Sequence, residues 1–184
     1  YPDIEVEITM TDRLVDLVEE GADLGIRSGH LADSSLVARR ICDHERVICA
    51  SPDYLRRHGT PKKPAQLADH ECLVIANVPA LRRWPFNTAN GVQSIEVGGR
   101  VTANNADTLL QLGLMGTGII RLLDVIVGEH IAAGRLVPVL DDAHHVEALP
   151  LHAVYPEMQW MSPRARSFLD LLVKRADGFA RQPV

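Results

Sequence analysis

The stretch that decides the fold is Asp23-Leu-Gly-Ile-Arg-Ser-Gly-His-Leu-Ala-Asp-Ser-Ser-Leu-Val-Ala-Arg-Arg-Ile41. Leu24 begins a short apolar run that breaks at Ser28-Gly29, and a polar loop separates it from a second apolar run that starts at Leu36. This pattern predicts a strand, an exposed polar loop and a second strand. Rigid strands that deliver a polar, glycine-containing loop to the surface are typical of binding sites.

The residues before this stretch predict a β-α-β unit. Residues 4–8 alternate between apolar and acidic side chains, which predicts a strand with one buried face. Thr11 or Asp12 can cap a following helix, and Gly21 supplies its end. The strand at 23–27 comes next, so we expect a parallel pair with a right-handed crossover.

Further along the chain, hydrophobic periodicity and glycine or proline punctuation predict more strands and helices. We expect strands at 36–42, 45–50, 72–76, 119–123, 136–140 and 148–155, and helices at 51–59, 106–115, 124–133 and from 162 onward. The region 83–102 predicts an antiparallel hairpin with turns at Asn90-Gly91 and Gly98-Gly99. Alternating strands and helices indicate an α/β architecture with parallel sheets. The hairpin-rich middle indicates two lobes, joined by crossings near 43–45 and 144–147.

Composition excludes several classes of protein. The 184 residues are 46% hydrophobic and 23% charged, which is typical of a folded globular chain and not of a disordered one. The formal net charge of -5 and the aromatic content of 4% give no electrostatic or stacking surface for nucleic acid. No apolar run approaches the roughly 18 residues of a membrane span, and no secretory signal opens the chain.

The first residues and the cysteines suggest a piece of a longer protein in a reducing compartment. The chain opens at Tyr1-Pro2 without an initiator Met, and we interpret it as a fragment. Cys42, Cys49 and Cys72 lack CxxC spacing and sit among apolar neighbours, so we expect them to be small buried side chains.

Catalytic motifs are missing from the sequence. No Ser lies in a GxSxG motif, so a nucleophile elbow is not predicted. Gly116-Thr-Gly118 follows a predicted helix and precedes a strand, the reverse of a dinucleotide-binding turn, and is interpreted as a helix stop. Asp141-Asp-Ala-His-His145 carries metal-capable groups without HExxH or CxxC, and a solvated loop is the favoured interpretation. We therefore predict no catalytic residue, no metal ligand and no cofactor.

Polar residues at predicted strand ends and helix starts are better candidates for binding. In α/β sheets, ligands bind near the carboxyl ends of the strands, and helix N-termini offer free N–H groups to anions. Each such residue alone is more often a cap or turn residue. Together they predict hydrogen-bond donors for a small ligand, and the residues so placed are Thr9, Thr11, Ser28, Gly29, Asn77, Asn104 and Asn105.

An ordered series of segments resembles the effector-binding domain of LysR-type transcriptional regulators over nearly the whole length. Any one segment is a weak signal, but the ordered set is specific. The segments are Tyr1-Pro-Asp-Ile-Glu-Val6, Asp23-Leu-Gly-Ile-Arg-Ser-Gly29, Asp33-Ser-Ser-Leu-Val-Ala-Arg-Arg-Ile41, Ala50-Ser-Pro-Asp-Tyr-Leu55, Gly59-Thr-Pro61, Pro64-Ala-Gln-Leu-Ala-Asp-His-Glu-Cys-Leu73, Asn104-Asn105, Gly116-Thr-Gly-Ile-Ile120, Gly134-Arg-Leu-Val-Pro-Val-Leu140, Leu151-His-Ala-Val-Tyr-Pro156 and Ser162-Pro-Arg-Ala-Arg-Ser-Phe-Leu-Asp-Leu-Leu172.

The resemblance implies a type 2 periplasmic-binding-protein-like α/β fold. Each of its two lobes is expected to be a mixed, mostly parallel sheet flanked by helices, with an effector cleft between them. Lobe I would comprise residues 1–43 and 147–184, and lobe II residues 44–146. By position, Thr11, Ser28 and Gly29 would face the cleft from lobe I, and Asn104, Asn105 and Thr117 from lobe II. Asn77 is added because it ends a predicted strand.

The resemblance also implies parts that precede Tyr1, namely a winged helix-turn-helix and the first strand and helix of this domain. DNA would then be bound through the missing N-terminal domain and not by this segment. We expect a non-enzymatic, cytoplasmic domain that senses a small-molecule effector, such as a carboxylate, and forms a homodimer or tetramer. The alternatives are a periplasmic solute-binding protein, which a secretory signal upstream would favour, and an enzyme, which would need a base or nucleophile in the cleft.

Overall fold

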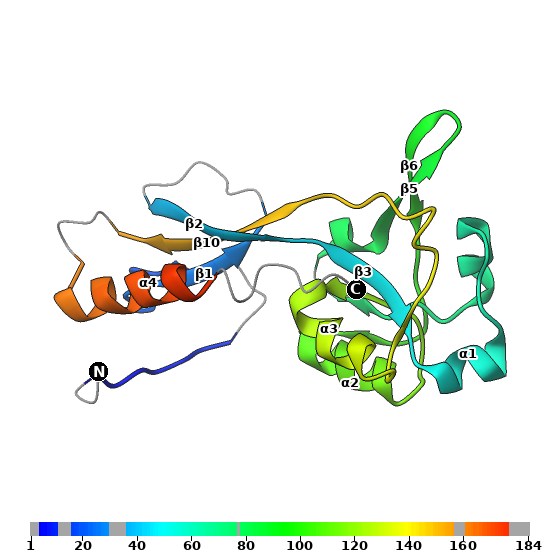
Figure 1. The fold of residues 1–184 in the computed structure, drawn as a ribbon, viewed down its shortest axis with the longest axis horizontal. Helices are drawn as coiled ribbons and strands as arrows, with labels where there is room; N and C mark the ends of the chain where they lie inside the picture. The colour runs from blue at the N-terminus through cyan, green and yellow to red at the C-terminus, as the bar shows by residue number, and fades with distance from the viewer. Residues whose placement is uncertain (1–3, 11–15, 30–35, 77, 157–160, 177–184) are drawn as a thin grey trace. The chain divides into compact units, whose positions relative to one another are not determined.

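The computed structural model describes residues 4–10, 16–29, 36–76, 78–156 and 161–176. The chain divides into two compact units, the first made of Tyr1–His44 with Ala148–Gln182 and the second of Glu45–Glu147 with Pro183–Val184 (Figure 1). Within the described part of the chain, none of the helices has the length and hydrophobicity needed to cross a membrane.

The first unit is built on a three-stranded antiparallel sheet. Its strands β1 (Gly25–Ser28), β10 (Leu149–Tyr155) and β2 (Val37–His44) lie in the order β1-β10-β2. Helix α4 (Pro163–Ala176) contributes Leu169 to a small core with Ala153 and Tyr155 of β10. An ion pair of 2.9 Å between Arg39 and Asp170 joins β2 to the same helix.

The β-α-β unit predicted for the start of the chain is not present in the described residues. Residues 4–10 have no regular secondary structure, and residues 17–21 form a turn that ends at Gly21, where φ is 64°. A strand is stable only when its N–H and C=O groups are paired with a neighbour, and β1 pairs with β10 instead of with residues 4–8. The predicted strand and its parallel pairing are therefore wrong. Thr11 and Asp12, the predicted caps, lie outside the described residues.

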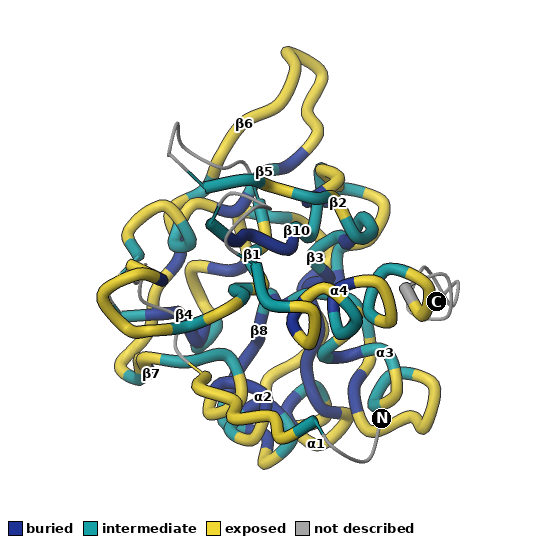
Figure 2. The backbone as a smooth tube through the Cα atoms, turned by 90° about the vertical axis from the view of Figure 1, so that its left-hand side faces the viewer, coloured by how far each residue is buried: buried dark blue, intermediate teal, exposed yellow. Residues whose placement is uncertain are grey.

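The second unit contains a three-stranded sheet in the order β8-β3-β9. Its strands are β8 (Ile120–Leu123), β3 (Arg46–Ala50) and β9 (Val137–Pro138), and both pairings are antiparallel. Helices α2 (Ala106–Leu114) and α3 (Asp124–Ala132) pack on one face, where Cys49, Leu109 and Val127 are buried together. Figure 2 shows how deeply β3 and β8 are buried.

A second apolar cluster brings Ile48 of β3 together with Tyr54, Trp84 and Phe86. Tyr54 comes from α1 (Pro52–His58), and the two other aromatic residues come from β5 (Arg83–Thr88), which pairs with β6 (Gly91–Glu96). The resulting hairpin projects from the rest of its unit (Figure 1). Two 3-10 helices, η1 (Pro64–Asp69) and η2 (Pro79–Arg82), complete this region.

Parallel pairing is less common than the sequence predicted. Among the described strands, β4 (Val74–Ile75) and β7 (Thr102–Ala103) pair in parallel, as do Cys72 and Ile119 in an isolated bridge, and the other strand pairs are antiparallel. The expectation of parallel sheets assumes a crossover helix between successive strands. Here β3 follows β2 directly, with Glu45 alone between them.

Most predicted helix ends are confirmed, and a hairpin turn forms close to one of the two predicted positions. Ser51 Oγ accepts a hydrogen bond from the backbone N–H of Tyr54 at the start of α1. The hairpin turn lies at Ala89-Asn90, one residue before the predicted pair, and Gly91, with a φ of 98°, begins β6 opposite Thr88. Gly98-Gly99 is not a turn; a Cβ atom on Gly99 would collide with the carboxylate of Glu71, so glycine is required there for close approach.

Candidate functional site

In the first unit, the predicted ligand-binding residues Ser28 and Gly29 lie at the end of β1. Ser28 is the last residue of the strand, opposite Leu151, and its side chain is exposed. The backbone N–H of Gly29 donates to the carbonyl of Pro150 at 2.9 Å, and its φ of 93° favours glycine. The strand therefore presents the Ser28 hydroxyl to solvent, as predicted for a strand end. Thr11 lies outside the described residues.

In the second unit, Asn104 and Asn105 lie together at the start of α2. Asn105 Oδ1 accepts from the backbone N–H of Thr108 at 2.8 Å, so Asn105 is the N-cap of the helix. Its Nδ2 group donates to Asn104 Oδ1 at 3.2 Å. The oxygen of Asn105 is thus used by the helix, and ligand contacts from this pair would come from the remaining amide N–H groups. Asn77 lies outside the described residues.

Thr117 lies at the opposite end of α2 from the two asparagines. The helix has nine residues, so its ends are separated by about 13 Å. The backbone N–H of Thr117 donates to the carbonyl of Leu112, just beyond the helix. The structure does not bring Thr117 together with Asn104 and Asn105.

Thr117 instead lines a depression of about 610 Å³ in the second unit. Tyr54 is central to it: its hydroxyl accepts from the backbone N–H of Glu71 at 3.0 Å and is 3.1 Å from His70 Nδ1. His58 stacks on the Tyr54 ring, with centroids 4.6 Å apart. Burial, together with the nearby His58, lowers the pKa of His70 below its usual range.

The charged groups of this depression are largely paired with one another or with the backbone. The Arg57 guanidinium donates to the carbonyl of Gly116 at 2.8 Å and also to Asp53. The Glu71 carboxylate accepts from the backbone N–H groups of Arg100 and Val101. The Arg57 contact joins α1 to the end of α2, and the Glu71 contacts join residue 71 to the backbone at 100–101.

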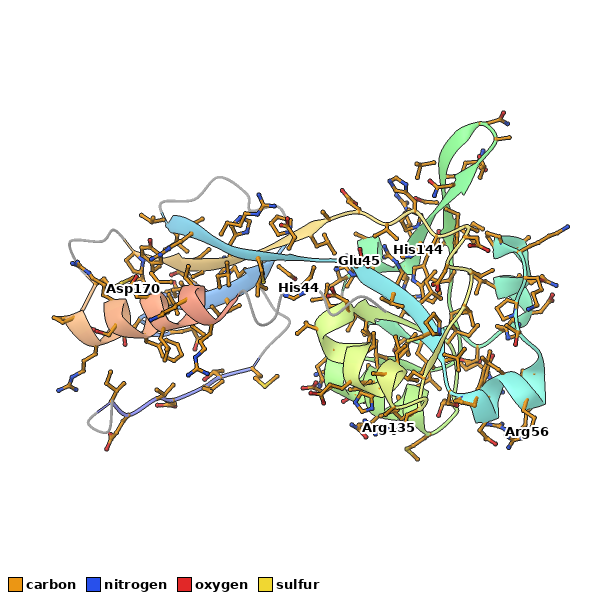
Figure 3. All side chains as sticks on the ribbon, viewed as in Figure 1. His44, Glu45, Arg56, Arg135, His144 and Asp170 are labelled. Atoms are coloured by element: carbon orange, nitrogen blue, oxygen red, sulfur yellow. The ribbon has the colours of Figure 1, made fainter. Side chains whose placement is uncertain are left out.

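A polar cluster that the sequence did not predict lies on the sheet of the second unit. It consists of Arg46 on β3, Arg121 on β8 and His144. Arg121 Nε donates to His144 Nε2 at 3.0 Å. His144, labelled in Figure 3, is 4% exposed. Its ring and that of Phe86 form an edge-type contact with centroids 6.2 Å apart. The sequence predicted a solvated loop at 141–145, and this prediction is wrong for His144. The residue is buried because the backbone at 143–145 is hydrogen-bonded to residues 85–87 of β5.

Burial disfavours the charged forms in this cluster. Desolvation, with a contribution from Arg121, lowers the pKa of His144 to about 4, so this imidazole is neutral at pH 7 and accepts through Nε2. Desolvation and the nearby Arg46 lower the pKa of Arg121 to about 10. Desolvation also lowers the pKa of Arg46, and Glu147 opposes the shift at both arginines.

The three cysteines lie in different surroundings in the described ranges. Cys49 and Cys72 are fully buried, as predicted, and desolvation raises the pKa of each thiol to about 12. Cys42 is half-buried, with its Sγ 3.3 Å from His44 Nε2. Across the described segments, His, Cys, Asp and Glu side chains do not gather in groups of three or more that could hold a metal ion.

The architecture defines a class of protein first: α/β ligand-binding domains with the two-lobed, periplasmic-binding-protein-like fold. A family model described as the LysR substrate binding domain matches residues 1–177, and the chain belongs to this family. The resemblance found in the sequence is thereby confirmed.

Several relatives are similar over nearly the whole chain. The transcriptional regulator CrgA of Neisseria meningitidis serogroup B is 35% identical over 174 residues, which cover 95% of this chain and 58% of CrgA. An uncharacterised regulator of Escherichia coli, YhjC, is 37% identical over 176 residues, 94% of this chain and 58% of YhjC. The solved regulatory domain of CrgA has a TM-score of 0.89 at 35% identity, covering 96% of this chain and 86% of that domain. The chain thus spans little more than half the length of the curated relatives it matches.

Proposed function

We propose that this chain is the part of a LysR-type regulator that binds a small-molecule effector and transmits its presence to DNA binding. The observation that carries the proposal is the family match over residues 1–177, together with the likeness to the CrgA regulatory domain. Ser28, Gly29 and Asn104, with the remaining amide N–H groups of Asn105, supply hydrogen-bond donors and acceptors for the effector. Thr11, Asn77 and Thr117 stay predicted contacts.

The effector can act on DNA binding only if it binds one conformational state of the protein more tightly than another. A ligand shifts a conformational equilibrium only by as much as it prefers one state over the other. We propose that effector binding changes the relative populations of two states of a homo-oligomer. DNA would be bound by a segment outside this chain, in agreement with the net charge of -5.

The same proposal places the protein in the cytoplasm and assigns it no catalytic role. Its reported relatives are transcriptional regulators, which supports both statements. The predicted contact residues that the structure describes carry two hydroxyls, on Ser28 and Thr117, two amides and the backbone groups of Gly29. No observation favours the periplasmic solute-binding alternative.

The test is a thermal-shift screen of small metabolites on the protein that contains this chain, followed by DNA-binding measurements with each hit. A ligand at 100 times its dissociation constant stabilises the folded state by about 2.7 kcal/mol. We expect a hit to change DNA affinity. Ser28→Ala should lower the affinity for that metabolite at least several-fold. It should alter the free energy of unfolding by less than about 0.5 kcal/mol, because the side chain is exposed.

A matched control is Ser94→Ala, an exposed serine on the hairpin strand β6. It should leave both affinity and stability unchanged. Equal affinity of a metabolite for the wild type and for Ser28→Ala would show that Ser28 is not part of the site. Metabolites that bind without any change in DNA affinity would contradict the sensing function.

A further inference from the structure

Strand register places two arginines on one face of the second unit's sheet. Arg46 is opposite Leu123, and Ile48 is opposite Arg121. Residues two apart on a strand share a face, so Arg46 and Arg121 are diagonal neighbours on it, within reach of each other's long side chains. Farther along the same face, Ile48 and Ile119 are completely buried. The apolar face therefore ends in a pair of half-buried guanidinium groups.

His144 orients one of these guanidinium groups. Its backbone N–H donates to the carbonyl of Leu140 at 2.8 Å, and Asn87 donates to its carbonyl at 3.3 Å, so the residue is fixed at both ends. With Nε2 accepting from Arg121 Nε, the planar guanidinium is fixed at one edge. Its two Nη groups remain directed away from that edge, in the fork geometry that binds oxyanions through two parallel hydrogen bonds.

The positive charge of this pair is incompletely balanced. His144 is neutral at pH 7, so it supplies no negative charge to either arginine. Among the described residues, Glu147 is the carboxylate that attracts both arginines, and its side chain is exposed. Two neighbouring cations removed from water are costly unless an anion accompanies them. An anionic ligand would therefore stabilise the two neighbouring guanidinium groups.

We propose that Arg46 and Arg121, with His144 as the positioning residue, form a binding site for the oxyanion group of a small molecule. The chemistry is shared by planar carboxylates and tetrahedral phosphate or sulfate groups. The inference deepens the proposed function, and it rests on that function only for the identification of the oxyanion as part of the effector.

Calorimetric titration of the protein that contains this chain tests the site with sodium malonate and with sodium phosphate, at constant ionic strength. We expect at least one of these probes to bind at a single site per chain. Arg46→Gln and Arg121→Gln should each weaken binding about tenfold or more, because each removes charge-assisted hydrogen bonds to the anion. Binding of malonate alone would identify a carboxylate site, and binding of phosphate alone a phosphoryl or sulfuryl site.

The matched control is Arg135→Gln. Arg135 Nε donates to His130 Nδ1 at 3.0 Å, so this is also a guanidinium–imidazole hydrogen bond, but an exposed one. Arg135 is labelled in Figure 3. Its loss should leave affinity unchanged. Equal affinities in wild type and both cluster variants, or no binding of either anion, would overturn the inference. Arg46→Gln serves as the second variant where Arg121→Gln fails to fold, since Arg46 does not hold His144.

The experiments can contradict either of the two proposals without contradicting the other. Oxyanion binding that needs both arginines, without an effect of any metabolite on DNA affinity, would contradict the sensing function and support this site. A full effector response retained in Arg46→Gln and Arg121→Gln, with no oxyanion binding in wild type, would overturn this site alone.

Discussion

His144 gives the protein a pH-dependent stability because its folded environment disfavours the protonated ring. Burial and Arg121 lower its pKa from the usual 6.5 to about 4. Between these two values the unfolded chain binds more protons than the folded one, so stability falls as pH falls through this window and is constant above it. The loss is roughly 2 kcal/mol at pH 5 relative to pH 7.

Urea unfolding of wild type and His144→Gln at both pH values measures this effect. The glutamine variant should be less stable at pH 7, since it loses packing against Phe86, but it should lose about 2 kcal/mol less on acidification. His130→Gln, on the surface, should retain the wild-type dependence. An unchanged acid response in His144→Gln would assign the effect to other groups.

Single residues also show where sequence reasoning succeeds and where it stops. Ser51 and Asn105 were predictable caps, because a cap depends on neighbours three residues away. The role of His144 depends on Arg121, which is 23 positions away, and spacing along the chain does not encode that contact. One signal was present: Arg121 interrupts the apolar run 119–123, and a charge within a buried strand usually needs a partner.

At the scale of elements, the stability of the first unit depends on how α4 packs on its sheet. Leu169 is 1% exposed and lies in a small core with Ala153 and Tyr155. Leu169→Ala should lower the free energy of unfolding by about 2–4 kcal/mol through lost burial and the cavity left behind. Leu171, two residues along the same helix, is 36% exposed.

Chemical denaturation followed by circular dichroism measures both variants. Leu171→Ala should cost less than Leu169→Ala, since Leu171 keeps 36% of its surface in water and loses less burial on truncation. Comparable losses in the two variants would show that α4 does not pack through the face described for it.

Element types were easier to predict than strand partners. Cap, proline and glycine signals located α1, and apolar runs located α2 and β3, because these signals depend on residues close together in the chain. The partner of a strand is set by tertiary contacts. The segment 4–8 has the alternation of a strand, yet β1 pairs with β10, more than 120 positions later in the chain.

At the scale of the molecule, the distribution of burial predicts where the chain opens. Ile48, Cys49 and Ile120 have no exposed surface and lie on hydrogen-bonded strands of the second unit. Val6 and Ile8 are 53% and 76% exposed, and residues 4–10 belong to no strand. Amides at exposed, unpaired positions open at almost no cost, whereas those of a buried sheet open only with large-scale unfolding.

Hydrogen–deuterium exchange of the 184-residue chain, read by mass spectrometry of its peptides, tests this gradient. Peptides covering 4–10 should exchange within seconds, and peptides covering β3 and β8 should remain protected for orders of magnitude longer. Val6→Thr should leave exchange in β3 unchanged, whereas Ile48→Ala should accelerate it by removing a fully buried side chain. Protection of 4–10 equal to that of β3 would mean that this segment pairs as a strand after all, as its alternating sequence first indicated, and would contradict the unpaired conformation described for it.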